Sequence, residues 1–350
     1  MPGRRFRLVE GVYAYVGELP LGCKLCIRGV KMVIFITGVC HDYCFYCPVS
    51  DKKFGKHVTY VNEEPAEDVE DLIDEAYRIG ASGASITGGD PLLSIEKTIA
   101  AIRLLKDVFG SDFHIHLYTS GRYATADVLR RLDEAGLDEI RFHPTAPWLI
   151  NRIEKALRVM KHSDVGVEIP VLPDKIEEIK MLIKKLDGMG VKFINLNEAE
   201  VSPSNITKLM ERGYKISRSK PVLEGSEEAA LKIVKWALEN TRQISVHYCP
   251  ARYKDKIQMR LRLLRKALRT ARPYEEVMPQ GLIRVLKVSK INSRVVELVK
   301  NGYGEIIDGV AYLDPRLADL VDGEIITRYP VGNYRRMPFE SFKKPIYDSN

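Results

Sequence analysis

Residues 31–50 read KMVIFITGVCHDYCFYCPVS, and they give the clearest indication of the fold class. The run from Lys31 to Thr37 is almost continuously apolar, which predicts a buried strand of a parallel sheet. Three cysteines follow it at spacings of four and three residues: Cys40, Cys44 and Cys47. Cysteines clustered in this way indicate metal ligation. We therefore expect a metal centre on the loop directly after the first strand.

From residue 31 to about residue 248 the chain alternates strand-like and helix-like segments. Five further strands are expected after the first, at 83–89, 112–121, 137–144, 165–173 and 191–200. Helical patterns separate them, beginning with 65–80, and one more helix and strand are expected at 227–240 and 243–249. Such alternation must give a parallel sheet with right-handed crossovers, so the sequence predicts the α/β class.

The chain divides by character into four parts. We expect an N-terminal extension over 1–30, the α/β domain over 31–250, a basic helix with its linker over 251–279, and a small β-rich C-terminal domain over 280–350. Proline residues near the last boundary favour a break there.

The composition is that of a globular protein. Hydrophobic residues make up 45% of the chain, and 54 Lys+Arg against 47 Asp+Glu give a net charge of +7, which permits an anionic partner without requiring one. No apolar run is long enough to cross a membrane, and the N-terminus lacks the pattern of a secretory signal. We therefore expect a cytoplasmic protein without a membrane partner. In a reducing compartment thiols stay free, so we expect no disulfide framework from its six cysteines.

The chemistry of the cysteine triplet favours an iron–sulfur cluster. Thiolates are the ligands that such clusters require. Three ligands leave one iron of a cubane cluster without a protein donor, and an open position distinguishes a reactive metal centre from a structural one. Zinc would normally take four donors here, so it is the weaker interpretation.

The pattern Cys-x3-Cys-x2-Cys, with an aromatic residue before the last cysteine, resembles the radical S-adenosylmethionine (SAM) superfamily. Cys40, Cys44, Cys47 and Tyr46 match it. The resemblance implies a partial (βα)6 TIM-like barrel of the radical SAM type, a 4Fe-4S cluster whose open iron binds SAM, and Tyr46 packed against the adenine. It also implies that an electron from a reductant protein cleaves SAM to methionine and a 5′-deoxyadenosyl radical, which takes a hydrogen from a substrate.

A narrower likeness rests on the general layout and on the segments INLNEAE (194–200) and YKDKIQMRLRLLRKA (253–267). In these the chain resembles archaeal-type proteins related to pyruvate formate-lyase activating enzymes. That likeness implies no particular substrate, which could be a glycine of a protein, a nucleoside in RNA or a small metabolite.

A second motif, Gly88-Gly89-Asp90-Pro91, ends the second expected strand. It resembles the Gly-Gly-Glu-Pro motif of the family, in which glycines let the backbone approach the methionine end of SAM. Further polar residues stand at the ends of later strands, where a barrel places its ligands. We expect contacts to SAM or substrate from three of them: Ser120, Glu168 and Asn197. The alternative is that they cap helices or satisfy loop amides.

A second metal site is predicted from the remaining cysteines. Cys23 and Cys26 precede the first strand, and alternation puts His247 and Cys249 on one face of the last strand. The four side chains would make a closed tetrahedral zinc site. Alternatively, the three cysteines hold an auxiliary iron–sulfur cluster, or the thiols are incidental and buried as apolar groups. Either metal would tie the N-terminal extension to the barrel.

The helix expected over 256–272 is strongly basic. Ile257, Leu261, Leu264 and Leu268 predict an apolar stripe, which leaves the basic side chains facing solvent. They could contact the phosphates of RNA, or be solvated side chains that cover apolar surface with their stems.

Two functions of different classes follow. The first is a radical SAM enzyme with an unidentified substrate. The alternative is a non-catalytic, metal-stabilised nucleic-acid-binding module, which would not account for the Gly-Gly-Asp-Pro motif at a strand end.

Overall fold

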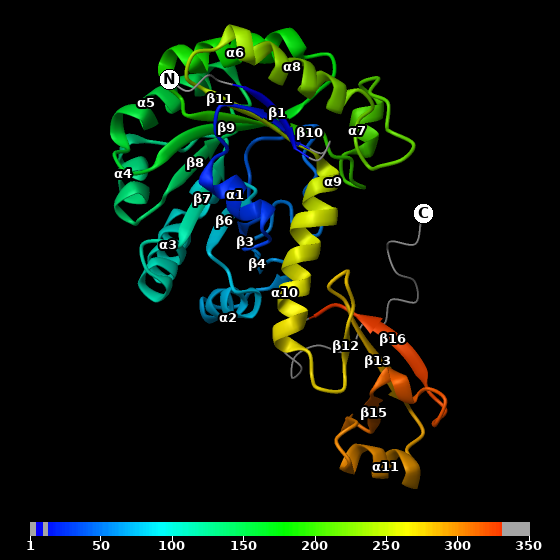
Figure 1. The fold of residues 1–350 in the computed structure, drawn as a ribbon. Coiled ribbons are helices and arrows are strands. Elements are labelled where there is room, and N and C mark those ends of the chain that lie inside the picture. The colour runs from blue at the N-terminus through cyan, green and yellow to red at the C-terminus, as the bar shows by residue number, and fades with distance from the viewer. Residues whose placement is uncertain (1–4, 10–12, 331–350) are drawn as a thin grey trace. The chain divides into compact units, whose positions relative to one another are not determined.

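The computed structural model describes residues 5–9 and 13–330, and it forms two compact units (Figure 1). The first unit comprises Met1–Asp74 and Ala81–Gln258, and the second comprises Glu75–Gly80 and Met259–Asn350. The four-part division expected from the sequence stays a prediction, and residues 331–350 of the expected C-terminal domain lie outside the described residues.

The first unit is built on a sheet of parallel strands. In spatial order they are β3 (Lys31–Thr37), β6 (Gly83–Gly88), β7 (His114–Thr119), β8 (Glu139–Phe142), β9 (Asp164–Val171), β10 (Phe193–Glu198) and β11 (Ser245–Cys249). The first six are the predicted strands, and β11 is the further one. The predicted α/β partial barrel is confirmed.

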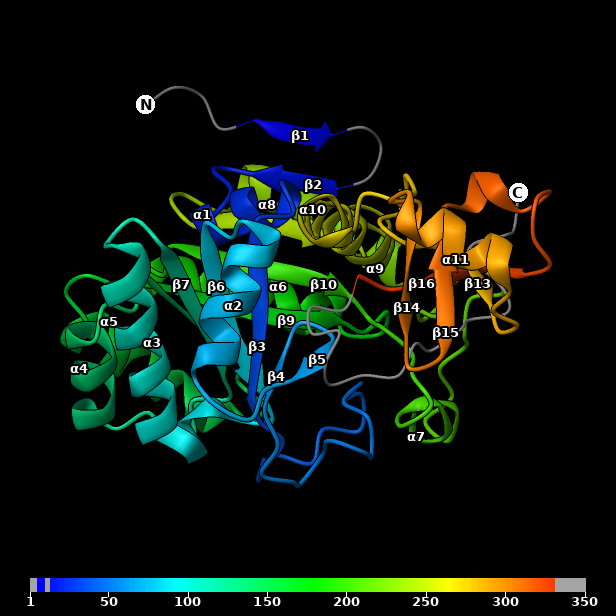
Figure 2. The ribbon, with the colours of Figure 1, turned by 90° about the horizontal axis from the view of Figure 1, so that it is seen from below.

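Antiparallel strands extend the sheet beyond both ends of the parallel series. Next to β11 lie β2 (Tyr13–Val16) and then β1 (Phe6–Val9), and next to β3 lie β4 (Tyr60–Val61) and β5 (Glu64–Pro65). Figure 2 shows β1 and β2 side by side. Because β1 and β5 are the two ends of this strand order, the described sheet is an open barrel rather than a closed one.

Helices follow the strands and cover the outer face of the curved sheet (Figure 1). They are α3 (Ile95–Phe109), α4 (Ala126–Glu134), α5 (Ile150–Val159), α6 (Ile176–Met189) and α8 (Ser226–Asn240). The helix α2 (Glu70–Ile79) follows β5, and its residues from Glu75 on belong to the second unit. The helix expected over 65–80 begins only at Glu70, because Pro65 pairs with Tyr60 in the β4–β5 hairpin. Shorter elements are α1 (Leu21–Ile27), η1 (Pro91–Ser94), η2 (Pro147–Leu149), α7 (Ile206–Met210), α9 (Ala251–Tyr253) and the π-helix Lys254–Met259.

A buried carboxylate holds the loop that leads into β9, within the first unit. Asp133, near the end of α4, accepts hydrogen bonds from the amides of Lys161, His162 and Ser163, which precede β9 (2.8, 3.1 and 2.9 Å). Burial opposes ionisation of Asp133, but these hydrogen bonds prevail and hold its pKa below the usual range. The charged form of Asp133 therefore stabilises the fold.

The second unit holds a small antiparallel sheet. Its strands are β12 (Glu276–Val277), β13 (Ile283–Val288), β14 (Gly304–Ile307), β15 (Val310–Leu313) and β16 (Glu324–Arg328). They lie in the order β12-β13-β15-β14, with β16 also paired to β13. The helices are α10 (Arg260–Thr270), α11 (Ser293–Lys300) and the short η4 (Pro315–Leu317). Its core includes Leu286, Val295 and Leu313.

The predicted orientation of the basic helix is wrong. In α10 the Lys266 side chain is buried, 2% exposed, whereas Leu268 is 67% exposed. Lys266 turns inward because the buried carboxylate of Glu75 receives its ammonium group at 2.8 Å. Arg265 likewise donates to backbone carbonyl groups, those of Ile79 and Gly80. Basic residues of this helix thus serve the packing of the second unit itself.

Among the described residues, no helix combines the length and the apolar character that crossing a membrane requires.

Candidate metal centre and cofactor site

The cysteine triplet lies on the loop between β3 and β4. Cys40, Cys44 and Cys47 are all free thiols and partly exposed. The pKa of Cys44 is raised to about 11, chiefly by burial and in smaller part by the charges of Cys47 and Cys40, so the three thiols act on one another. Within residues 5–9 and 13–330, no three His, Cys, Asp or Glu side chains already stand where they could hold a metal ion. The donor set, three free thiols on one loop, nevertheless fits a cluster that takes three thiolate ligands.

Asp42, inside the cysteine loop, ties that loop to the barrel. Its carboxylate accepts hydrogen bonds from Arg122 Nη2 at 2.5 Å and from the Thr145 hydroxyl at 2.9 Å. Burial opposes ionisation of Asp42, but Arg122 and the hydroxyl donors hold its pKa below the usual range. Sequence reasoning missed all three residues, because each partner stands on a different loop.

Gly88 and Gly89 bring the end of β6 against the backbone that leads into the cysteine loop. A β-carbon at Gly88 would lie 2.2 Å from the carbonyl oxygen of Thr37, and one at Gly89 would lie 2.2 Å from that of Val39. The amides of Gly89 and Asp90 donate to these same two oxygens at 2.8 Å. Only glycine permits this approach, so these glycines shape the cysteine loop. Their predicted contact with SAM stays a prediction.

Asp90 and Ser120 are brought together beneath this turn. The buried Asp90 carboxylate accepts from the Thr119 hydroxyl at 2.8 Å, from the Ser120 hydroxyl at 2.8 Å and from the Leu92 amide at 3.1 Å. Burial raises the pKa of Asp90, and these hydrogen bonds oppose the rise. The side chains of Asp90 and Ser120 therefore form hydrogen bonds within the protein. This agrees with the alternative that Ser120 satisfies local polar groups rather than contacting SAM or substrate.

Tyr46 extends the site toward the barrel interior. Its hydroxyl lies 3.0 Å from Nε2 of His143, and Nδ1 of His143 lies 3.0 Å from the carbonyl oxygen of Glu168. Burial lowers the pKa of His143, so the ring is neutral. A carbonyl oxygen only accepts, which makes Nδ1 the donor and assigns Nε2 as the acceptor of the Tyr46 hydroxyl. His143 had not been predicted.

The barrel interior joins Glu168 and Asn197, two of the predicted residues. The Glu168 carboxylate accepts from Arg141 Nη1 at 2.7 Å, from Asn195 Nδ2 at 2.8 Å and from Asn197 Nδ2 at 2.8 Å. Burial opposes ionisation of Glu168, but Arg141 and the two amides hold its pKa below the usual range. Arg141 also pairs with buried Glu139, at 2.5 Å. Arg141 was not predicted, because Glu168 comes from the neighbouring strand β9 and no local pattern shows that Arg141 and Glu139 are buried as a pair.

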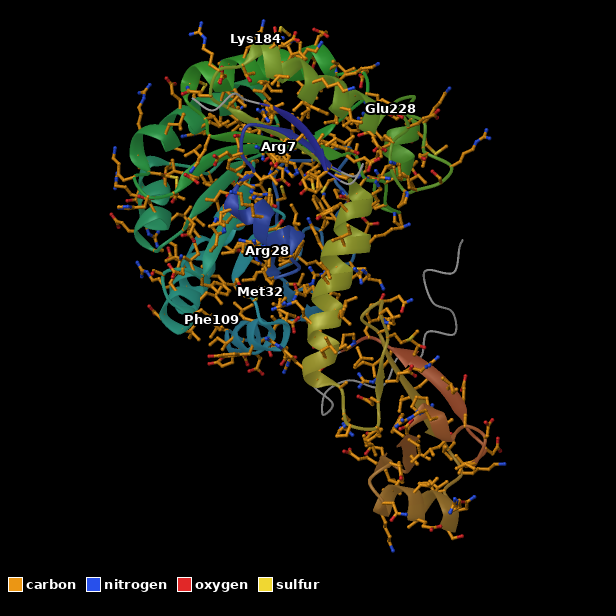
Figure 3. The ribbon with its side chains drawn as sticks, viewed as in Figure 1. Arg7, Arg28, Met32, Phe109, Lys184 and Glu228 are labelled. Atoms are coloured by element: carbon orange, nitrogen blue, oxygen red, sulfur yellow. The ribbon has the colours of Figure 1, made fainter. Side chains whose placement is uncertain are left out.

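The other predicted cysteines line a small cavity of about 50 Å³ in the same interior. Cys23 and Cys26 come from α1, and His247 and Cys249 come from β11, so the structure brings together the four residues of the predicted second site. Figure 3 marks Arg28, which follows α1, and shows side chains filling the space that the curved sheet partly encloses. Glu168, Asn197 and Lys254 also line the cavity.

A family model and a curated protein both match the chain. A family model described as the radical SAM superfamily matches residues 34–148, which include the cysteine loop and the Gly-Gly-Asp-Pro motif. A curated protein of Methanocaldococcus jannaschii, named "Putative glycyl-radical enzyme activating enzyme", is 38% identical over 346 residues, which cover 92% of this chain and 90% of the relative.

Solved structures resemble the fold at low sequence identity. Streptococcus suis SuiB bound to S-adenosylmethionine has a TM-score of 0.45 and 10% identity, with 63% of this chain and 50% of SuiB covered. Coproporphyrinogen III oxidase from Escherichia coli, described as a radical SAM enzyme, has a TM-score of 0.40 and 12% identity, with 63% and 56% covered. The chain thus spans about half the length of these two proteins, and likenesses this distant carry no functional argument.

The family model and the curated relative agree with what the cysteine loop indicates. They favour an enzyme over the non-catalytic binding module, and they imply a 4Fe-4S cluster and SAM as its cofactors. On these grounds the chain belongs to the radical SAM superfamily.

Proposed function

We propose that this protein is an activating enzyme: it cleaves SAM reductively and takes a hydrogen atom from a glycine of a protein substrate. The observation that carries the proposal is its 38% identity, over 92% of the chain, to a relative named as an activating enzyme of glycyl-radical enzymes. In the reaction the 5′-deoxyadenosyl radical gains the hydrogen and becomes 5′-deoxyadenosine, and the unpaired electron stays on the glycine.

Cys40, Cys44 and Cys47 would hold the 4Fe-4S cluster. When bound, the cluster supplies the electron that splits the sulfonium of SAM into methionine and the radical. The chain itself has to keep the three thiols together on a partly exposed loop. Asp42 supports this through its hydrogen bonds to Arg122 and Thr145, which fix the loop between the first two ligands against the barrel.

SAM would lie between this loop and the carboxyl ends of the strands. Backbone groups of Gly88, Gly89 and Asp90 would receive its methionine end, and Tyr46 would pack against its adenine. In support, Tyr46 stands between two of the cluster cysteines, and its hydroxyl is held by His143. Further polar contacts to SAM or substrate would come from Ser120, Glu168 and Asn197.

A protein substrate is better supported than an RNA nucleoside or a small metabolite. The case for RNA rested on the basic helix, but Lys266 is buried against Glu75, and Arg265 and Arg269 donate to backbone carbonyl groups. Fewer cations are thus available for phosphates than the sequence suggested. The reaction also needs a reductant protein as electron donor, which fits a cytoplasmic enzyme. Zinc or an auxiliary cluster at the remaining cysteines is a separate proposal.

Anaerobic reconstitution with iron and sulfide, followed by dithionite and SAM, tests the function. We expect release of 5′-deoxyadenosine and methionine, and none from the triple variant C40S/C44S/C47S. The substrate class is tested by adding extract fractions enriched in candidate glycyl-radical enzymes and recording electron paramagnetic resonance spectra. A doublet that collapses when the glycine carries deuterium supports the proposal, whereas release stimulated by RNA or by a small-molecule fraction instead would overturn the substrate assignment.

A further inference from the structure

We propose that Cys23, Cys26, Cys249 and His247 bind one structural zinc ion inside the barrel, apart from the cluster loop. All four side chains line the same cavity of about 50 Å³. The inference does not depend on the proposed function, because none of the four belongs to the Cys40 loop.

The donors come in two short-range pairs from elements far apart in the sequence. Cys23 and Cys26 are three residues apart in α1, a Cys-x2-Cys spacing typical of zinc sites. His247 and Cys249 are two residues apart on β11, so both face the same side of the sheet. The helix α1 packs against β3, β6 and β7, whereas β11 lies at the other end of the parallel series. An ion bound by the cysteines of α1 and by the two donors of β11 would therefore connect the two ends of the open barrel.

The hydrogen bonds around His247 prepare one of its nitrogens as a ligand. Asn195 Nδ2 lies 2.8 Å from the Glu168 carboxylate and 3.5 Å from Cys23 Sγ, so it is the donor end of that amide. The other end, Oδ1, must then accept, and it lies 3.1 Å from His247 Nδ1. The proton of the imidazole is therefore on Nδ1, and Nε2 keeps its lone pair. A zinc-bound histidine is held in the same way by a hydrogen bond at its other nitrogen.

The surrounding charges fit a set of thiolates. Three thiolates with one Zn²⁺ leave a net charge of −1, which is costly to bury without a cation. Arg141 Nη2 lies 3.5 Å from Cys23 Sγ. Arg141 also pairs with Glu139 and Glu168. A guanidinium at this distance from Cys23 would offset part of the negative charge of a zinc–thiolate group.

The donor set favours an ion over a cluster, because three cysteines and one histidine are a usual ligand set of structural zinc sites. Within the described residues no three donors already meet at one point. The ion would therefore complete the site by drawing the thiols inward through side-chain rotation, and a tetrahedral Cys3His set leaves no open position.

Metal analysis of the C40S/C44S/C47S variant, expressed in medium with zinc and iron, tests the proposal without disturbing the four donors. We expect one zinc per chain and no iron. Zinc X-ray absorption should show about three sulfur neighbours near 2.3 Å and one nitrogen near 2.0 Å. A variant without zinc, or one that holds iron and sulfide instead, would overturn the inference. Failure of the proposed function has a different signature, which is absence of SAM cleavage in the wild-type protein that keeps its zinc.

Two histidine variants test the ligand set. His247→Gln should lower the affinity for zinc at least tenfold in competition with a chromogenic chelator. His116→Gln, which removes another fully buried imidazole of the barrel, should leave the affinity unchanged. Equal zinc affinity of the two variants would exclude His247 as a ligand, and unchanged zinc content in Cys249→Ser would overturn the site.

Discussion

Replacing Asp42 by asparagine should loosen the cysteine loop while leaving the barrel folded. The carboxylate is almost buried, with 6% of its side chain exposed, and it receives Arg122 at 2.5 Å and the Thr145 hydroxyl at 2.9 Å. Asparagine has nearly the same shape, but it lacks the charge and presents an amide N–H₂ to donors. Asp42→Asn therefore removes the ion pair without creating a large cavity.

The magnitude follows from the geometry. A hydrogen bond to a charged group contributes about 1.5–3 kcal/mol. The Arg122 side chain is 35% exposed, so the value is discounted toward that of a surface pair, to about 1.5–2.5 kcal/mol. At 1.4 kcal/mol per factor of ten, local opening of the loop becomes about 10- to 70-fold more frequent.

Hydrogen exchange followed by mass spectrometry measures this opening in the metal-free protein. Peptides that cover residues 40–47 should exchange about 10- to 70-fold faster in Asp42→Asn, since exchange scales with the population of the open state. Asp51→Asn is the matched control, because it removes an equal charge from an exposed residue of the same loop. Arg122→Gln should produce a similar increase, and the double variant little more. Equal exchange in Asp42→Asn and the control would refute the reasoning.

The remaining predictions concern close packing, pH and a buried ion pair. Gly89→Ala should lower the free energy of unfolding by about 1–3 kcal/mol in chemical denaturation, because its β-carbon would lie 2.2 Å from a carbonyl oxygen. It should also lower the iron taken up on reconstitution. Gly188→Ala is the control: its β-carbon would meet no atom within 4 Å, so the change should be neutral or stabilising. Asp133→Ala should cost about 2–4 kcal/mol at neutral pH. Because folding lowers the pKa of Asp133, the part of the wild type's advantage that depends on its charge should be complete above about pH 5 and should shrink as the pH falls below about 4 through the lowered pKa. An advantage of the same size at acid and at neutral pH would contradict this. Lys266→Met should lower the free energy of unfolding by about 3–5 kcal/mol, because it removes the ammonium group that pairs with the buried Glu75 carboxylate. In thermal unfolding, the double variant Lys266→Met/Glu75→Leu should recover most of that loss.

The sequence predicts most of the barrel because its signals are local. The first parallel strand, β3, is an almost continuous apolar run, and the βα alternation that follows it leaves few topologies. The cysteine loop and the Gly-Gly-Asp-Pro turn are likewise contiguous in sequence. Of the residues proposed for the site, Glu168 and Asn197 meet each other, whereas Ser120 lies against Asp90.

Interactions between distant segments could not be predicted. Asp42 and Arg122 are 80 residues apart, and the local sequence around each of them does not identify the other as its partner. The predicted orientation of the basic helix was wrong for the same reason. An apolar stripe through Leu268 is the natural choice from periodicity, but the buried Glu75 turns Lys266 inward instead, and no pattern within the helix reveals a carboxylate nearly 200 positions earlier in the chain.

Radical SAM chemistry in this protein needs a 4Fe-4S cluster held by Cys40, Cys44 and Cys47, with one iron open to SAM. Electron paramagnetic resonance of the anaerobically reconstituted, reduced protein, before and after addition of SAM, detects such a cluster directly. A reduced 4Fe-4S signal whose g values shift when SAM is added, and which is absent from C40S/C44S/C47S, is the predicted result. A signal that does not respond to SAM, or one that survives in the triple variant, would contradict it.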